Sequence, residues 1–169
     1  MESVGTRFIV KPKIYIETSV ISYLTARPSG DLVVAACQQI TRDWWDDRRG
    51  SFDLFISARV IAEATQGDGQ AAEKRLEMLR GIPVLEVTDE ALSLAERLMR
   101  QLHLPQNAVE DALHIATAVV SGMDYLLSWN CRHIANAHVA HDVLMFVQAL
   151  GYPGTLLCTP QALLEDYDE

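Results

Sequence analysis

Short apolar segments alternate with longer helical patterns along this 169-residue chain. Five segments rich in β-branched, aromatic and leucine residues are expected to be strands: residues 8–17, 52–56, 84–87, 125–129 and 155–158. Apolar spacing and capping residues, among them Asp31, Ser57 and Thr88, indicate helices at 20–26, 31–48, 58–64, 71–80, 88–102, 107–120 and 137–150. Parallel strands need crossover connections, so this alternation predicts an α/β fold with a central parallel sheet of about five strands between helix layers.

Length and composition predict one domain over residues 1–169, with a core over about 13–160 and frayed ends. The formal charge of −9 argues against tight non-specific binding of nucleic acid, although a metal ion can still bridge a phosphate substrate to acidic side chains. No run of about 18 apolar residues is present, which predicts no membrane span. Three widely spaced cysteines without a CxxC pattern indicate thiols in a reducing cytoplasm.

The segment 107–120 reads as a helix that is apolar on nearly all sides, as expected of a buried helix. Glu110, His114 and Thr117 fall on one stripe of it, and Asp111 lies about 60° from His114. A carboxylate there needs a partner, a cap or a metal ion, because an unpaired charge is costly in an apolar interior. The alternative is an acid stabilised by the helix dipole in a first turn capped by Asn107.

Polar side chains also follow two of the predicted strands. Glu17, Thr18 and Ser19 end the first strand, and Asn130 follows the fourth. In a parallel α/β sheet, ligands bind beyond the carboxyl ends of the strands, so Glu17 and Asn130 would share one edge if these strands are neighbours. A turn role for Asn130 stays open.

A further acid, Glu63, lies on the predicted helix 58–64. Together with Glu17 and Asp111 it would supply hard oxygen ligands, to which Asn130 adds an amide, and this set suits Mg²⁺ or Mn²⁺. Such a cation can activate water for attack on a phosphodiester and stabilise the leaving oxygen. A solvated surface role remains the alternative for Glu63, and for His114 a hydrogen-bonded place in the core.

The order of these segments resembles a PIN domain, most closely the VapC-type toxins of bacterial toxin–antitoxin pairs. The resemblance rests on YIETSVI, VIAE, EDALHIA and DYLLSWN, and covers roughly residues 13 to 160. It implies a PIN-like three-layer sandwich and RNA cleavage with Mg²⁺ or Mn²⁺ held by acidic residues. It also implies a homodimer and inhibition by a cognate antitoxin protein.

Carried over motif by motif, Glu17, Glu63 and Asp111 fall on the family's metal-binding acids. Asn130 falls where a fourth acid is frequent, and Thr18 or Ser19 matches a small hydroxyl residue expected to bind substrate. Two departures stand out: Glu17 is one methylene longer than the usual aspartate, which would push its oxygens further into the site, and Asn130 lacks a negative charge.

These features predict a metal-dependent endoribonuclease. The alternative is a catalytically degenerate PIN-fold module that binds RNA or a partner protein without cleaving, which the departures at Glu17 and Asn130 favour. A phosphatase of another α/β fold ranks last, since no paired aspartate follows the first strand. Arginines at 42, 48 and 49 are candidates for guiding a phosphate backbone, although arginines at helix ends also match the helix dipole.

Overall fold

A computed structural model of the protein describes residues 10–165, and residues 8 and 9 of the first predicted strand lie outside this range. Five parallel strands form one sheet in the order β3-β2-β1-β4-β5. Their bounds are β1 Lys13–Ile16, β2 Asp53–Ser57, β3 Val84–Leu85, β4 Tyr125–Leu127 and β5 Leu156–Cys158. The predicted α/β class and parallel sheet are therefore confirmed, although β3 and β4 are shorter than their apolar segments.

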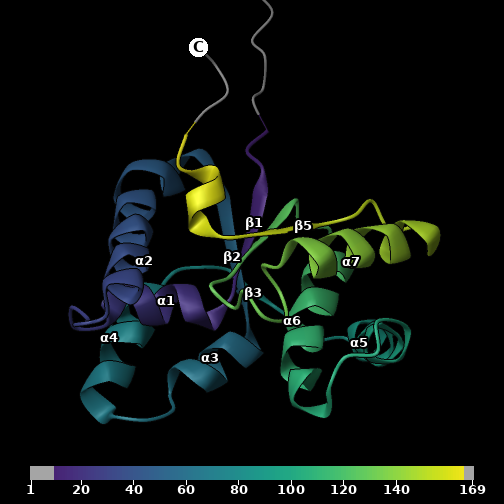
Figure 1. The fold of residues 1–169 in the computed structure, drawn as a ribbon, viewed down its shortest axis with the longest axis horizontal. Helices are drawn as coiled ribbons and strands as arrows, with labels where there is room; N and C mark the ends of the chain where they lie inside the picture. The colour runs from purple at the N-terminus through teal and green to yellow at the C-terminus, as the bar shows by residue number, and fades with distance from the viewer. Residues whose placement is uncertain (1–9, 166–169) are drawn as a thin grey trace, which may run out of the picture.

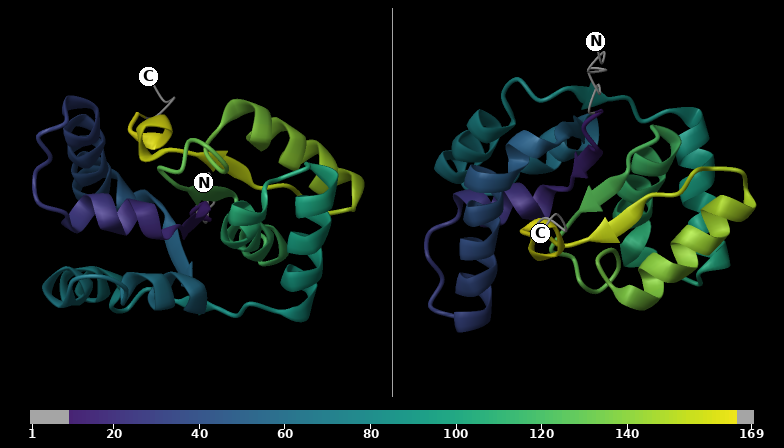
Figure 2. Two further views of the ribbon diagram at one scale, coloured as in Figure 1. Left: turned by 60° about the horizontal axis from the view of Figure 1, so that its bottom comes forward. Right: turned by 90° about the horizontal axis from the view of Figure 1, so that it is seen from above.

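Within residues 10–165, seven α-helices connect and cover these strands (Figure 1). They are α1 Thr18–Thr25, α2 Leu32–Asp43, α3 Ala58–Ala64, α4 Gly69–Leu79, α5 Asp89–Gln101, α6 Val109–Val120 and α7 Ala137–Ala149. Helices α1 to α4 lie on one side of the sheet and α5 to α7 on the other (Figure 2). This division follows from right-handed crossovers, because the chain moves from β1 to β3 in one direction and then returns to build β4 and β5 on the other side of β1. The result is the expected three-layer sandwich.

The first and fourth strands are neighbours, as the shared-edge hypothesis required. Ile16 of β1 is in register with Leu127 of β4, and the backbone N–H of Glu17 donates to the carbonyl of Leu127 over 3.0 Å. The strand order reverses between β1 and β4, which is where open α/β sheets bind ligands. The residues that follow these two strands therefore lie side by side at one edge.

Two helix predictions differ from the structure. The segment 31–48 is α2, capped by Asp31 as expected, followed by a π-helical turn at Trp44–Arg48. The buried side chains of Trp44 and Trp45 lie on this turn and join the core. The central helix α6 begins only at Val109, because Gln106–Ala108 forms a 3-10 turn, and Asn107 is not its N-cap.

The core lies on both faces of the sheet and includes residues of its inner strands, β1 and β4. Leu126 and Leu127 of β4 are fully buried, between the helices of the two layers. The three cysteines are free thiols, and burial raises the pKa of Cys158 to about 11. Within residues 10–165, none of the helices is both long and apolar enough to cross a membrane.

Candidate metal centre

The functional residues converge at the carboxyl-end edge of the sheet, beyond β1 and β4. Glu17 leaves the end of β1, Glu63 comes from α3 and His114 from α6. One potential ligand atom from each of the three lies within 4.8 Å of the others. The structure thus brings together two of the three predicted metal-binding acids, with a histidine in place of the third.

Glu17 is held by hydroxyl and amide donors from the residues around it. It is the N-cap of α1: its Oε1 accepts from the backbone N–H of Ser19 over 3.1 Å. Its Oε2 accepts from the hydroxyls of Ser19 and Ser128, the latter over 2.7 Å. The carboxylate is thus held against the first turn of α1, and one of its oxygens belongs to the cluster with Glu63 and His114. The side chain is only 7% exposed, and these donors compensate the charge at this depth.

Glu63 is fixed by two side chains on opposite sides. The hydroxyl of Thr18 donates to its Oε2, and Nε2 of His114 lies 3.1 Å from the same oxygen. A carboxylate only accepts, so Nε2 carries the proton in this pair. Burial alone would raise the pKa of Glu63, but the hydrogen bonds and charges of His114, Thr18 and Arg59 outweigh it and lower the pKa below its ordinary value. Glu63 is therefore a carboxylate at neutral pH, which is the form that binds a cation.

A buried hydrogen-bonded chain continues behind His114. Its Nδ1 lies 2.7 Å from the hydroxyl of Tyr15, which in turn lies 2.8 Å from the hydroxyl of Ser57. With Nε2 donating to Glu63, the second ring nitrogen, Nδ1, forms a hydrogen bond with the hydroxyl of Tyr15, and these two contacts fix the ring orientation. His114 is 2% exposed, so it is a hydrogen-bonded core histidine that also reaches the acidic cluster.

Replacing Tyr15 with phenylalanine tests this chain. The variant leaves Nδ1 of His114 and the hydroxyl of Ser57 without their shared partner, and we expect it to lower the free energy of unfolding by about 1–3 kcal/mol. Urea denaturation measures the change. As a control, Tyr152→Phe removes one exposed hydrogen bond to Glu90, and a loss as large as that of Tyr15→Phe would contradict the role of burial.

Asp111 forms a second cluster next to the first, together with Asn130 and His133. Its Oδ1 accepts from Nδ2 of Asn130 over 2.9 Å, and its Oδ2 accepts from Nδ1 of His133, also over 2.9 Å. Asn130 also has the turn role that was the alternative, since its Oδ1 accepts from the backbone N–H groups of Arg132 and His133. Both oxygens of Asp111 are thus oriented by residues that follow β4.

The structure places the predicted site residues at this edge in two clusters: Glu17 and Glu63 lie with His114, and Asp111 lies with Asn130. Thr18 and Ser19, predicted to contact substrate, each donate a hydroxyl to a glutamate. Glu110, on the same stripe as His114, lies exposed and pairs with Arg59 over 2.6 Å. His133 and Ser128 were not predicted. His133 contacts Asp111, 22 positions away, and Ser128 contacts Glu17, 111 positions away, so only the fold makes these contacts visible.

The predicted arginine cluster has structural partners. Nε of Arg48 lies 3.5 Å from the carbonyl oxygen of Leu163, and the guanidinium of Arg49 lies 4.8 Å from the centre of the Trp45 ring. Arg42 donates to Gln39 on its own helix. These contacts hold the π-helical turn and the C-terminal segment together, and a phosphate-guiding role for these arginines stays a prediction.

The fold and this acidic edge define an α/β protein with a candidate metal centre at the carboxyl ends of its strands. Comparisons with known proteins identify its family. Residues 14–134 match the family model of the PIN domain, which is most of the chain. The chain therefore belongs to the PIN-domain family. No curated protein gives a significant sequence match.

Two solved structures are similar in fold. One is VapC20 of Mycobacterium tuberculosis, a toxin that cleaves the sarcin-ricin loop, with a TM-score of 0.54 and 20% identity over 70% of this chain and 91% of that one. The other is VapBC2 of Rickettsia felis, bound to a DNA fragment from its promoter, with a TM-score of 0.51 and 13% identity over 69% of this chain and 86% of that one. At these identities the similarity establishes the fold.

Proposed function

We propose that the protein is a metal-dependent endoribonuclease that hydrolyses RNA phosphodiesters. The observation that carries this proposal is the convergence of Glu17, Glu63 and His114 within 4.8 Å at the edge where the strand order of a PIN domain reverses. Clusters of carboxylates repel one another, and a divalent cation relieves that repulsion. Asp111, the third acid predicted from the sequence, is one helical turn from His114 on α6 and is held by Asn130 and His133.

The donors present fit a divalent cation. Two carboxylates provide the oxygen ligands that Mg²⁺ and Mn²⁺ favour, while His114, whose Nε2 donates to Glu63, orients one of them. Glu17, Glu63 and Asp111 would hold the ion, with His114 beside them. A bound divalent cation supplies Lewis-acid stabilisation of the charge that develops on the phosphate.

The chain's own residues prepare this edge for the reaction. Ser19 and Ser128 orient the carboxylate of Glu17, while Thr18 and His114 orient that of Glu63. Hydrogen bonds of this kind fix ligand geometry and commonly change metal affinity or activity by about 10–100-fold when removed. Asn130 and His133 do the same for Asp111, so Asn130 supports the site as an orienting donor in place of a fourth acid.

The biological setting is proposed by analogy with the proteins of similar fold. We propose that this chain, as one domain, is a VapC-like toxin that acts in the cytoplasm, forms a homodimer and is inhibited by a cognate antitoxin protein. The support is the fold it shares with a sarcin-ricin-loop-cleaving toxin and with the VapBC2 complex.

A metal add-back assay tests the proposed activity. The purified protein is treated with EDTA, dialysed, and incubated with a structured RNA in the presence of Mn²⁺, Mg²⁺ or no divalent ion. We expect internal cleavage only when a divalent ion is restored. Equal cleavage without divalent ions, or cleavage that does not co-purify with the protein, would contradict the proposal.

One observation favours the second candidate, a PIN-fold module that binds RNA or a partner without cleaving it. Both oxygens of Asp111 and both oxygens of Glu17 already accept hydrogen bonds from side chains or backbone groups. Thermal unfolding with and without Mn²⁺ discriminates the two, because a ligand that binds only the folded state raises its apparent stability. An unchanged unfolding temperature at millimolar Mn²⁺ would favour the non-cleaving module.

A further inference from the structure

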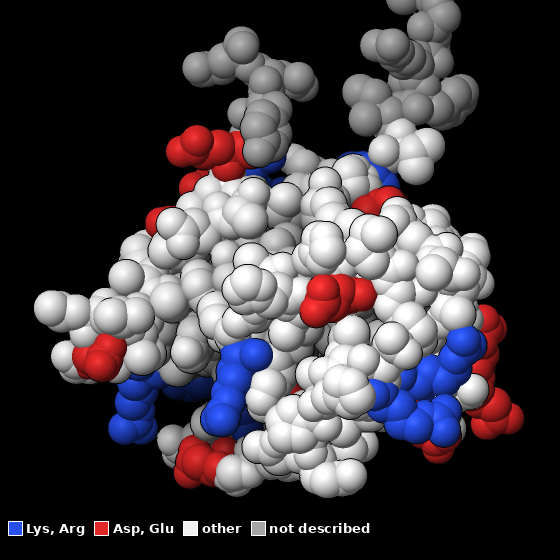
Figure 3. All heavy atoms as spheres, turned by 45° about the vertical axis from the view of Figure 1, so that its right-hand side comes forward, with Lys and Arg blue, Asp and Glu red and all other residues white. Residues whose placement is uncertain are grey.

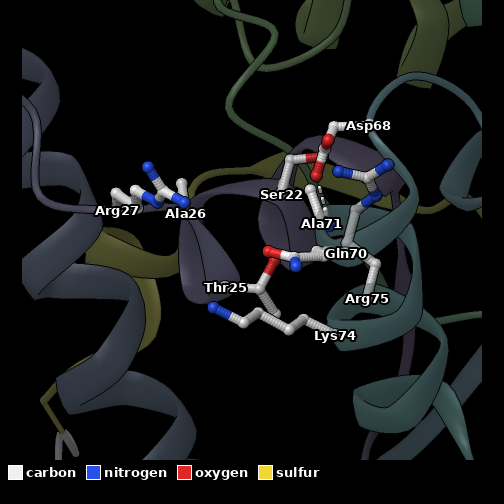
Figure 4. A pocket seen from close by; sticks show the side chains of 9 residues that line it. All are labelled: Ser22, Thr25, Ala26, Arg27, Asp68, Gln70, Ala71, Lys74 and Arg75. Carbon is white, nitrogen blue, oxygen red and sulfur yellow. Dashed lines mark hydrogen bonds between the residues drawn. The ribbon is translucent and has the colours of Figure 1, made fainter.

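A pocket of about 440 Å³ opens between α1 and α4, and none of its lining residues belongs to the carboxylate cluster (Figure 4). It is lined by hydroxyl, amide and basic side chains, chiefly Ser22, Thr25, Arg27, Gln70, Lys74 and Arg75. Gln70 and Lys74 extend from α4 toward Thr25 of α1 in the close-up view. This pocket has no part in the metal centre described above.

The charge of the pocket is opposite to that of the whole chain. The chain carries a formal charge of −9, and on the face shown in Figure 3 small groups of Lys and Arg are interspersed with Asp and Glu. The pocket instead brings three cationic side chains together with one acid, Asp68, whose Oδ1 accepts from the backbone N–H of Ala71 as the N-cap of α4. A local excess of positive charge on an acidic protein attracts anions to that place.

Helix α1 connects the pocket directly to the metal centre. Thr18, Ser22 and Thr25 are spaced by four and three residues, so their hydroxyls lie on one face of α1. With a rise of about 1.5 Å per residue, Ser22 and Thr25 lie about 6 and 10 Å along the helix from Thr18. Thr18 donates to Glu63, so one end of this polar stripe is at the acidic cluster and the other end is in the pocket.

The basic side of the pocket is fixed relative to Glu63. Nε of Arg75 donates to the carbonyl of Ala64 over 3.0 Å, and its terminal nitrogen donates to the carbonyl of Gln66. These acceptors lie at the end of α3, the helix that carries Glu63. Arg75 stays positively charged in these contacts and connects α4 to the segment that carries Glu63. Lys74 and Arg27 are exposed and can contact a bound anion.

From these observations we infer that the pocket binds backbone phosphates of the RNA strand, one or two nucleotides away from the bond that is cleaved. The inference rests on the proposed ribonuclease function. The ammonium of Lys74 and the guanidinium of Arg27 contact the phosphates, and Ser22 and Gln70 donate hydrogen bonds to phosphate or ribose oxygens. The hydroxyl of Thr25 already donates to the carbonyl of Ile21. Phosphate and ribose contacts position a strand and do not read its sequence, so the pocket contributes affinity and register.

The test measures RNA binding separately from cleavage. The double variant Arg27→Gln/Lys74→Gln is compared with the wild type and with Arg80→Gln, which removes one exposed positive charge at the end of α4, outside the pocket. Binding of a fluorescein-labelled single-stranded RNA is followed by anisotropy in EDTA, over a range of salt concentrations. Arg75 is left intact because its backbone contacts support α4.

We expect the double variant to bind RNA at least about tenfold more weakly at low salt, with a salt dependence less steep by about 1.4, because each phosphate contact to a single strand contributes about 0.7 to the slope. Arg80→Gln should stay near the wild type in both respects. Thermal unfolding of each variant verifies that the fold is retained.

The outcomes separate this inference from the proposed function. If the wild type cleaves RNA with Mn²⁺ but the double variant binds RNA with unchanged affinity and salt slope, the pocket inference is wrong and the ribonuclease stands. In that case an acidic protein segment becomes the occupant to examine. If the wild type neither binds nor cleaves RNA, both proposals are wrong.

Discussion

Asp111→Asn is expected to reduce Mn²⁺-dependent RNA cleavage by at least about a hundredfold, the upper range for loss of a supporting contact at a metal site. The substitution removes the negative charge and keeps the shape of the side chain. The amide oxygen can still accept from Nδ2 of Asn130, which lies 2.9 Å from Oδ1 of Asp111. Folding should therefore change little, and the loss would report the missing carboxylate.

The measurement compares initial cleavage rates of wild type and Asp111→Asn, purified identically, on one structured RNA. Asp142→Asn is the matched control, because this acid lies exposed on α7 and pairs only with its neighbour His141. We expect the control to cleave like the wild type. Unchanged cleavage by Asp111→Asn would remove Asp111 from the mechanism, and equal loss in both variants would indicate a contaminating nuclease or a preparation effect.

Leu126→Ala is expected to have the largest effect on stability. Leu126 is fully buried in β4, in register with Tyr15 of β1 on one side and Leu157 of β5 on the other. Shortening this side chain removes buried apolar contacts and leaves a cavity between the sheet and the helices packed on it, which typically costs about 2–5 kcal/mol. We expect the midpoint of urea unfolding to fall accordingly with an unchanged slope.

A leucine on the adjacent strand provides the control for this prediction. Leu156 of β5 is 51% exposed and pairs with Tyr125 of β4, so it has the same side chain in the same sheet without full burial. We expect Leu156→Ala to change the free energy of unfolding by only about 0.5 kcal/mol. Similar losses from the two substitutions would show that Leu126 is not at the centre of the core.

The layers of the fold could be predicted from the sequence because strand and helix patterns alternate clearly. The capping residues Asp31, Ser57 and Thr88 also marked helix starts that the structure confirms. The start of the central helix was predicted wrongly, since Asn107 is a good cap by type but lies in a 3-10 turn. The π-helical turn after α2 was not predicted either, because a short π segment leaves no distinct apolar period.

The site was predictable where a carboxylate stands out from an apolar pattern, as at Glu17 and Asp111. The site was less predictable where a histidine contacts an acid that lies on another element. His114 reaches Glu63 across 51 positions, and His133 reaches Asp111 from the loop after β4. Imidazole is common in cores and loops, so its residue type alone does not reveal which acid it will orient.

Manganese binding measured by electron paramagnetic resonance tests the central claim most directly, because the free ion gives the signal and bound ions are counted by its loss. The protein is titrated with Mn²⁺, and Glu63→Gln is titrated in parallel after thermal unfolding verifies its fold. If Glu17, Glu63 and His114 form a metal centre, the wild type shows saturable binding and Glu63→Gln binds at least about tenfold more weakly. Absence of saturable binding in the wild type, or equal binding by the two proteins, would contradict the account.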